Sequence, residues 1–73
     1  MINIVFQVTK SFPIDVYEDR ICVAFYNEWA RYTEKAIKAN TERTDTHVIE
    51  KALFIELDDA YEFESFLTKF FKY

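Results

Sequence analysis

The chain has 73 residues, a formal net charge of −4, no glycine, one proline, one cysteine and one histidine. This length allows one small domain, residues 1–73, in which a hydrophobic core alone gives marginal stability. The single cysteine excludes a disulfide within the chain, and together with one histidine it offers no zinc-ligand spacing. The remaining sources of stability are association with another chain or a core built from the eight Phe, five Tyr and one Trp.

Residues 2–9 alternate between apolar and more polar positions. One face of this segment carries Ile2, Ile4, Phe6 and Val8. An alternation with a period of two predicts a β-strand. We expect residues 10–13 to break this strand, with Phe12 held extended by the proline that follows it.

The next segment has the pattern of a helix. Asp15 and Glu18 have the spacing of a capping box, and nothing breaks a helix before Asn40, which can adopt the conformation that ends one. Apolar residues at helical spacing share one face, namely Ile14, Ile21, Phe25, Trp29, Tyr32, Ala36 and Ala39. We therefore predict one long helix over about residues 14–39. The alternative is a strand at residues 20–26, followed by a shorter helix from Asn27.

The remaining elements follow in order. Residues 41–46 read as a polar loop, and the alternation over residues 47–57 predicts a second strand. A last helix opens at Asp59, with an apolar face made of Ala60, Phe63, Leu67, Phe70 and Phe71. The predicted fold is a small α+β domain in the order β-α-β-α, with a long first helix packed on a small sheet. Because two strands make a poor sheet, dimerisation is one way to complete it.

A second line of apolar residues follows the predicted long helix on the side away from its core face. It consists of Val16, Val23, Ala30 and Ile37, with Tyr26 on its edge. A surface helix normally carries charged residues there. Three interpretations are open. The residues are scattered exposed apolar side chains of the usual kind, the seam of a homodimer in which two long helices pack while sheet edges pair, or a docking face for a different protein.

Acidic residues gather at the start of the last helix, namely Glu56, Asp58, Asp59, Glu62 and Glu64. Carboxylates in such positions stabilise the helix N-terminus. The functional interpretation is an anionic surface that, with Tyr61, contacts a basic groove on a partner. Asp15 and Asp19, with Glu18, form a smaller acidic group at the start of the long helix. Parallel strands would bring both helix starts to one end, so that the two groups merge.

Enzymatic chemistry is disfavoured, because a chain without glycine cannot form the usual phosphate-cradling loop and one histidine with one cysteine cannot build a triad. Cys22 is expected to be a buried, inert thiol beside the core face. His47 is expected to be a surface or strand-edge histidine. We expect the Glu28 carboxylate to bend outward toward Arg31 or Lys35. No catalytic residue, metal site or cofactor is predicted.

The sequence also indicates the cellular compartment of the protein. Met1 leads directly into an alternating segment without the basic region of a signal peptide. The longest apolar run, residues 21–26, is too short to span a membrane. A single cysteine fits a reducing compartment. We therefore expect a cytoplasmic protein, which lies in the host-cell cytoplasm if its source is viral.

The charge balance indicates the kind of partner. Nine basic residues are dispersed along the chain and outnumbered by thirteen acidic ones, which disfavours nucleic-acid binding and suits a basic protein. We predict a non-enzymatic protein-binding module, typical of small phage or mobile-element proteins that inhibit or modulate a larger host complex in defence or nucleic-acid processing. The alternatives are a homodimeric structural or assembly subunit without an inhibitory role, and a DNA mimic. No membrane partner is expected.

Overall fold

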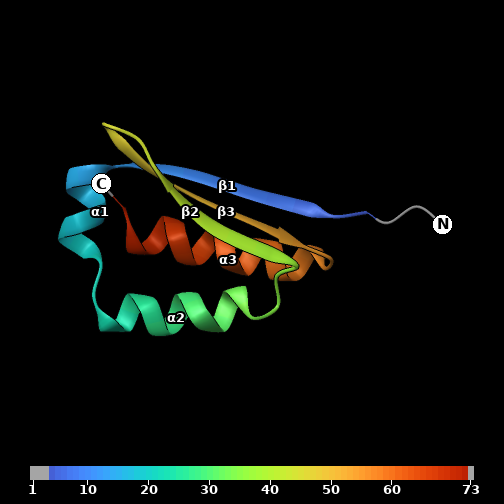
Figure 1. Ribbon diagram of the computed structural model, residues 1–73. Coiled ribbons are helices and arrows are strands. Elements are labelled where there is room, and N and C mark those ends of the chain that lie inside the picture. The colour runs from blue at the N-terminus through green and yellow to red at the C-terminus, as the bar shows by residue number, and fades with distance from the viewer. Residues whose placement is uncertain (1–3, 73) are drawn as a thin grey trace.

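The computed structural model describes residues 4–72, so Ile2 of the predicted first strand lies outside the described residues. In chain order the elements are β1 (Phe6–Pro13), α1 (Ile14–Arg20), α2 (Val23–Thr33), β2 (Lys38–Arg43), β3 (His47–Phe54) and α3 (Leu57–Phe70). The predicted α+β class is confirmed, with the order β-α-α-β-β-α (Figure 1).

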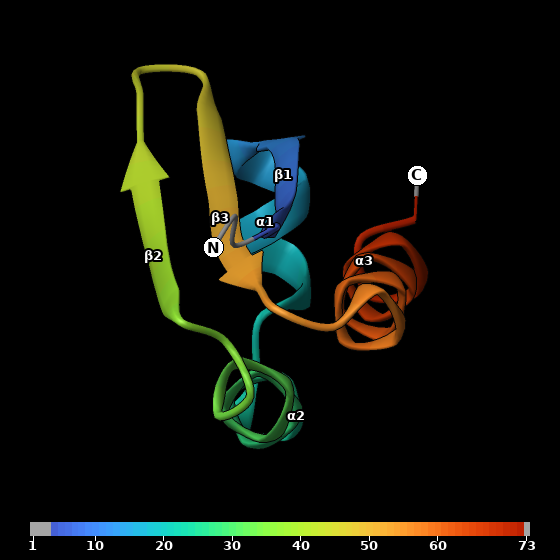
Figure 2. The same cartoon turned by 90° about the vertical axis from the view of Figure 1, so that its right-hand side faces the viewer.

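The three strands form one antiparallel sheet with the order β1-β3-β2. The register sets Ala52 of the central strand between Val8 of β1 and Ala39 of β2. Along β3 the side chains alternate between the two faces of the sheet. Those that point inward are all buried, namely Val48, Glu50, Ala52 and Phe54. The helices lie on this inner face, and no helix of residues 4–72 covers the opposite face (Figures 1 and 2).

The prediction of one helix over residues 14–39 is wrong. The helix ends at Arg20, and the next two residues are extended, with φ −67° and ψ 139° at Ile21 and φ −161° and ψ 177° at Cys22. A second helix then begins at Val23 and ends at Thr33, and residues 38–43 are a strand. The alternative of a strand at residues 20–26 is also wrong. The apolar spacing continues across the break because α1 and α2 both direct their apolar side chains into the same core.

The predicted capping box at Asp15 and Glu18 is wrong as well. Pro13 occupies the N-cap position of α1, which has no side-chain cap bond. The Glu18 carboxylate instead pairs with the Arg43 guanidinium of β2 at 3.1 Å. The Ile14 N–H donates to the Thr46 carbonyl at 3.0 Å, which ties the corner between β1 and α1 to the β2–β3 hairpin. A tertiary partner therefore replaces the local cap.

Residues 38–43 are an edge strand, although we predicted a helix end and a polar loop there. Only Ala39 is apolar in this segment, so hydrophobic alternation gives no signal. The strand forms because β3 offers a free edge at a short hairpin connection. The predicted break of the first strand at residues 10–13 is wrong, because these residues continue β1 and pair with the start of β3. The second predicted strand begins at His47 as expected but ends at Phe54, and the last helix begins at Leu57 instead of Asp59.

The core is aromatic, as the composition suggests. Phe25 of α2 packs against Phe66 of α3 and against Phe71, which follows α3, with ring centroids 5.5 and 5.0 Å apart. Phe71 also stacks on Tyr17 of α1 at 4.8 Å. All seven residues of the predicted core-facing stripe are buried in this core or packed against it. The prediction that Cys22 is buried is wrong, because the break between α1 and α2 leaves this residue exposed.

Candidate functional site

The two acidic groups lie at opposite ends of the helical layer. Asp15 and Asp19 are exposed on α1, which contacts the C-terminal end of α3 through the stacked rings of Tyr17 and Phe71. The other group lies at the N-cap and in the first turns of α3, at the end of this helix away from α1 (Figure 1). A helix of 14 residues separates them by about 20 Å at 1.5 Å per residue. The antiparallel sheet thus keeps the groups apart, and they do not merge into one surface.

Within the group on α3, the acidic residues differ in their partners. The Lys35 ammonium, just beyond α2, lies 3.7 Å from a carboxylate oxygen of Asp59 and 3.9 Å from one of Glu62. These contacts tie the end of α2 to the start of α3. Among the described residues, Glu56, Asp58 and Glu64 are exposed and make no ion pair. The unneutralised charge is therefore carried by these three side chains.

An open groove runs between α2 and α3 beside this charge. Its volume is about 560 Å³, and its lining comprises Ala24, Glu28, Tyr32, Tyr61, Glu62, Ser65, Phe66, Lys69 and Phe70. The rings of Tyr32 and Phe66 lie 5.0 Å apart, and those of Phe66 and Phe70 lie 5.7 Å apart, so the groove has an aromatic wall. Tyr61 stands at its rim with 59% of its surface exposed.

The periodicity of α3 determines which acidic residues belong to this groove. Asp58 precedes Glu62 by four residues and therefore shares its face of the helix. Glu64 follows Glu62 by two residues, about 160° round the helix, on the flank away from α2. We define the acidic–aromatic surface as Glu56, Asp58, Tyr61 and Glu62. Glu64 lies outside it.

Glu28 behaves as predicted. Its carboxylate lies 3.5 Å from the Arg31 guanidinium on the exposed side of α2 and also lines the groove. His47 is half-exposed at the start of β3, where its Nδ1 lies 2.8 Å from the Thr46 hydroxyl. The predicted surface position of this histidine is confirmed.

The second apolar line does not form one seam. Val16 lies on α1 and packs against the core, whereas Ile37 is exposed between α2 and β2. Only Val23, Tyr26 and Ala30 share a helix, α2, and all three are exposed. The break after Arg20 and the end of α2 at Thr33 interrupt the repeat of seven.

The most constrained polar group is Glu50, to which the sequence analysis gave no role. Its carboxylate is 1% exposed and accepts hydrogen bonds from the Tyr17 hydroxyl at 2.9 Å, the Trp29 indole N–H at 3.2 Å and the Thr41 hydroxyl at 2.7 Å. A signal existed, because Glu50 alternates in register with Val48, Ala52 and Phe54. A charged residue in an apolar row indicates a buried carboxylate with dedicated donors.

The Tyr17 phenol reflects this environment. Burial raises its pKa well above the usual value of 10, and the nearby Glu50 carboxylate, which would repel a phenolate and accepts the phenol's hydrogen bond, raises it further. Glu50 thereby connects α1, α2 and β2 to the central strand. Because it is enclosed, this network stabilises the fold and offers no binding surface.

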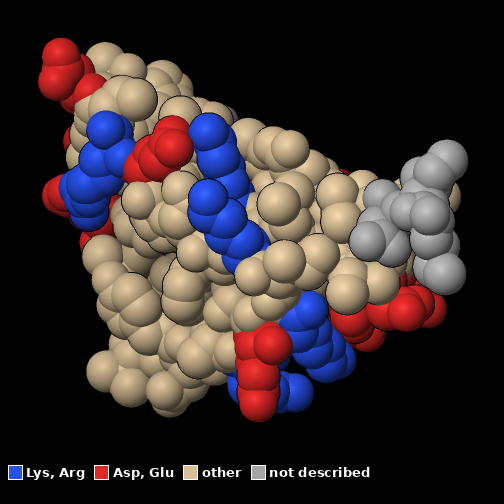
Figure 3. Space-filling view, turned by 45° about the vertical axis from the view of Figure 1, so that its right-hand side comes forward, with Lys and Arg blue, Asp and Glu red and all other residues tan. Residues whose placement is uncertain are grey.

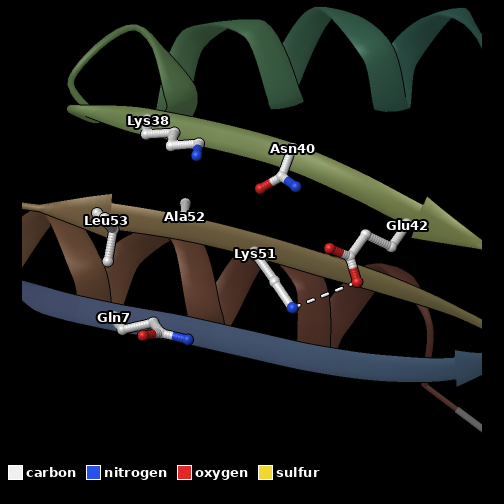
Figure 4. A pocket seen from close by; sticks show the side chains of 7 residues that line it. All are labelled: Gln7, Lys38, Asn40, Glu42, Lys51, Ala52 and Leu53. Carbon is white, nitrogen blue, oxygen red and sulfur yellow. Dashed lines mark ion pairs between the residues drawn. The ribbon is translucent and has the colours of Figure 1, made fainter.

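The outer face of the sheet carries a second, smaller hollow of about 220 Å³ (Figure 4). Polar side chains of β2 line it, namely Lys38, Asn40 and Glu42, together with Gln7, Lys51, Ala52 and Leu53. The Lys51 ammonium pairs with the Glu42 carboxylate at 3.2 Å. This face is polar over β2, where Lys38 and Glu42 place opposite charges on either side of Asn40.

Within residues 4–72, no three His, Cys, Asp or Glu side chains lie close enough together to hold a metal ion. None of the described helices is both long and apolar enough to cross a bilayer. No protein-family model, curated protein or solved structure matches the chain. The acidic–aromatic surface is the exposed region where charged side chains, an exposed tyrosine and a groove lie together.

Proposed function

We propose that the protein is a non-enzymatic protein-binding module that contacts a basic partner through the acidic–aromatic surface. One observation carries the proposal. Tyr61 is exposed at the rim of a groove with an aromatic wall, three residues along α3 from the exposed Asp58 and close in sequence to the exposed Glu56. Exposed aromatic side chains are enriched among residues that dominate protein interfaces, and a charged rim selects and steers a partner of opposite charge.

The partner segment that fits carries an apolar or aromatic side chain next to a lysine or arginine. The apolar side chain would enter the groove between Tyr61 and Phe66, and the cation would lie against Asp58. Lys35 already neutralises part of the charge of Glu62, so Asp58 makes the larger contribution to attraction. The same geometry predicts an affinity that falls as salt increases.

A pull-down from a lysate of the native host tests this surface. Binding should be lost with Asp58→Lys and with Tyr61→Ala. Tyr61 is exposed, and the exposed Asp58 contributes to the fold only through its favourable position in the first turn of α3. Glu64→Lys is the matched control, because it makes the same change of charge on the opposite flank of α3, and it should retain the partner. Equal capture by the wild type and by Asp58→Lys would contradict the proposal.

The narrower proposal is that the partner is a larger host complex of defence or nucleic-acid processing, which the protein inhibits in the manner of small phage or mobile-element proteins. Its support is the acidic, glycine-free and aromatic-rich composition. Adding the purified protein to the captured complex should reduce that complex's activity, and Asp58→Lys should not. Unchanged activity at saturating protein would remove the inhibitory role and leave the binding role in place.

DNA mimicry has less support. A mimic needs carboxylates spaced like phosphates along one surface, free of neighbouring cations. Six of the thirteen acidic residues instead lie within ion-pair distance of lysine or arginine, namely Glu18, Asp19, Glu28, Glu42, Asp59 and Glu62. A seventh, Glu50, is buried.

A further inference from the structure

The strand β2 forms an edge of the sheet whose side chains are almost all exposed. At the hairpin the Thr44 N–H donates to the His47 carbonyl at 2.8 Å, which marks this as a hydrogen-bonded pair of the antiparallel ladder. Because such pairs alternate along the ladder, Lys38, Asn40 and Glu42 direct their backbone groups toward β3. The backbone N–H and C=O groups of Ala39, Thr41 and Arg43 therefore point away from the sheet, where another strand can bind them.

The opposite edge is protected against such pairing. Lys10 of β1 points to the inner face opposite Glu50, and Pro13 at the end of β1 has no N–H to donate. Inward-pointing charges and prolines are the usual devices that prevent edge strands from pairing. Strand β2 has no proline, and its inward-pointing charge, Arg43, lies at its end and pairs with Glu18. In the middle of the strand, Ala39 and Thr41 face inward.

We propose that two copies of the chain pair through β2, antiparallel across a two-fold axis at Asn40, to form one six-stranded sheet. In this arrangement Ala39 and Thr41 of each copy exchange backbone hydrogen bonds with Thr41 and Ala39 of the other. Asn40 lies opposite its own counterpart. The pairing is isologous, as the commonest closed oligomers are.

The charges select this register. Residues with outward backbone groups must face one another, so a two-fold axis near the middle of β2 passes through Asn40 or through Thr41. With the axis at Asn40, Lys38 of each copy faces Glu42 of the other on the outer face of the sheet. With the axis at Thr41, Glu42 would face Asn40 and form no ion pair. Figure 4 shows Lys38, Asn40 and Glu42 in this order along the same face of β2.

The helix α2 adds apolar surface on the same side. Its Glu28 flank faces α3, and Trp29 reaches Glu50 beneath β2. At 100° per residue, Tyr26 lies beyond Trp29 as seen from Glu28, on the flank of α2 away from α3. Tyr26 and Val23 are 53% and 76% exposed. A second copy that pairs at β2 comes close to this flank of α2. Its own apolar side chains can then pack against Tyr26 and Val23.

Cysteine cross-linking tests the register. In a Cys22→Ser background, Asn40→Cys places two thiols across the axis, where facing Cα atoms in a non-hydrogen-bonded pair lie about 4.5 Å apart, within the range of a disulfide. Mild oxidation at micromolar protein should convert most of this variant into a covalent dimer. In the same background, Glu42→Cys is the matched control on the same face. Its thiols would be about 13 Å apart, so it should remain monomeric. No dimer from Asn40→Cys, or equal cross-linking of both variants, would overturn the register.

Charge exchange tests the pairing without a covalent link. Lys38→Glu and Glu42→Lys each set like charges opposite one another twice per dimer, and each should raise the dimer dissociation constant about tenfold or more. The double variant restores opposite charges and should return the constant to within about threefold of the wild-type value. Sedimentation equilibrium measures these constants. A wild-type protein that stays monomeric at millimolar concentration, or a double variant weaker than both single variants, would contradict the pairing. Because none of these residues belongs to the acidic–aromatic surface, failure here would leave the proposed function intact.

Discussion

At the scale of single residues, the fold depends most on Glu50. A carboxylate that is 1% exposed would be strongly destabilising without partners, and here three donors from three elements satisfy it. The arrangement is specific, because Tyr17, Trp29 and Thr41 reach it only when α1, α2 and β2 are all in place. The Glu50 carboxylate is therefore fully hydrogen-bonded only in the completely folded protein.

Two substitutions at Glu50 distinguish the effect of losing its hydrogen-bond acceptor oxygens from the effect of losing its negative charge. Glu50→Ala leaves three donors without an acceptor inside the protein, and we expect a loss of about 3 kcal/mol in the free energy of unfolding. Glu50→Gln keeps one carbonyl oxygen, and the Tyr17 hydroxyl can accept from the new amide, so the loss should be about 1 kcal/mol. Urea unfolding measures both values. Equal losses for the two variants would mean that the hydrogen bonds contribute little.

The raised pKa of Tyr17 has a consequence at high pH. Its phenol stays protonated in the folded state at a pH where the unfolded chain's phenol ionises, near 10. Its contribution to stability is therefore complete below about pH 10 and is lost as the pH rises beyond it. Urea unfolding between pH 8 and 11 should show a steeper alkaline decline for the wild type than for Tyr17→Phe. Identical slopes would contradict the buried position of this phenol.

At the scale of elements, the break between α1 and α2 decides the architecture. A continuous helix would have been about 39 Å long, which the short strands cannot cover. Two extended residues allow both helices to pack beneath the same sheet, with Tyr17 and Phe25 in edge-to-face contact at 5.9 Å. No glycine or proline marks the break, so tertiary packing alone determines it.

The break predicts an unusual effect at Cys22. This residue occupies the N-cap position of α2 with extended backbone and no side-chain cap bond. Cys22→Asp should supply that bond and raise the free energy of unfolding by about 1 kcal/mol, with Cys22→Ala as the control that adds none. In the middle of a continuous helix, aspartate would instead destabilise. A urea-unfolding midpoint lower for Cys22→Asp than for Cys22→Ala would contradict the break.

The same elements show how much the sequence could reveal. The spacing of Ile21, Phe25 and Trp29 predicted the core-facing side correctly, because burial follows periodicity whether or not the helix is continuous. Hydrophobic alternation could not predict strand β2, because its sequence KANTER contains one apolar residue. The strand forms because it pairs with the free edge of β3. The alternation with Val48 and Phe54 placed Glu50 on the buried side of its strand, but its three hydrogen-bond donors and the exposure of Cys22 depend on tertiary contacts.

At the scale of the whole molecule, the helices cover one face of the sheet and leave distinct exposed regions. The acidic–aromatic surface lies at the start of α3, whereas the open edge of β2 lies on the side of the sheet away from β1 (Figures 1 and 2). The space-filling view shows acidic and basic side chains interspersed on the face that it displays (Figure 3). Mixed charge of this kind disfavours a broad electrostatic footprint and favours recognition at a small surface. If both proposals hold, pairing through β2 leaves two copies of the acidic–aromatic surface free, so that the dimer is bivalent.

The central claim is that the start of α3 and the adjacent groove form the surface that binds a partner. Hydrogen–deuterium exchange of the protein, alone and in its captured complex, tests this most directly because it requires no substitution. We predict that binding slows amide exchange in residues 56–66 and in the groove-facing part of α2, while the exchange of β1 and β3 stays unchanged. Slower exchange confined to the sheet, with residues 56–66 unaffected, would contradict the account.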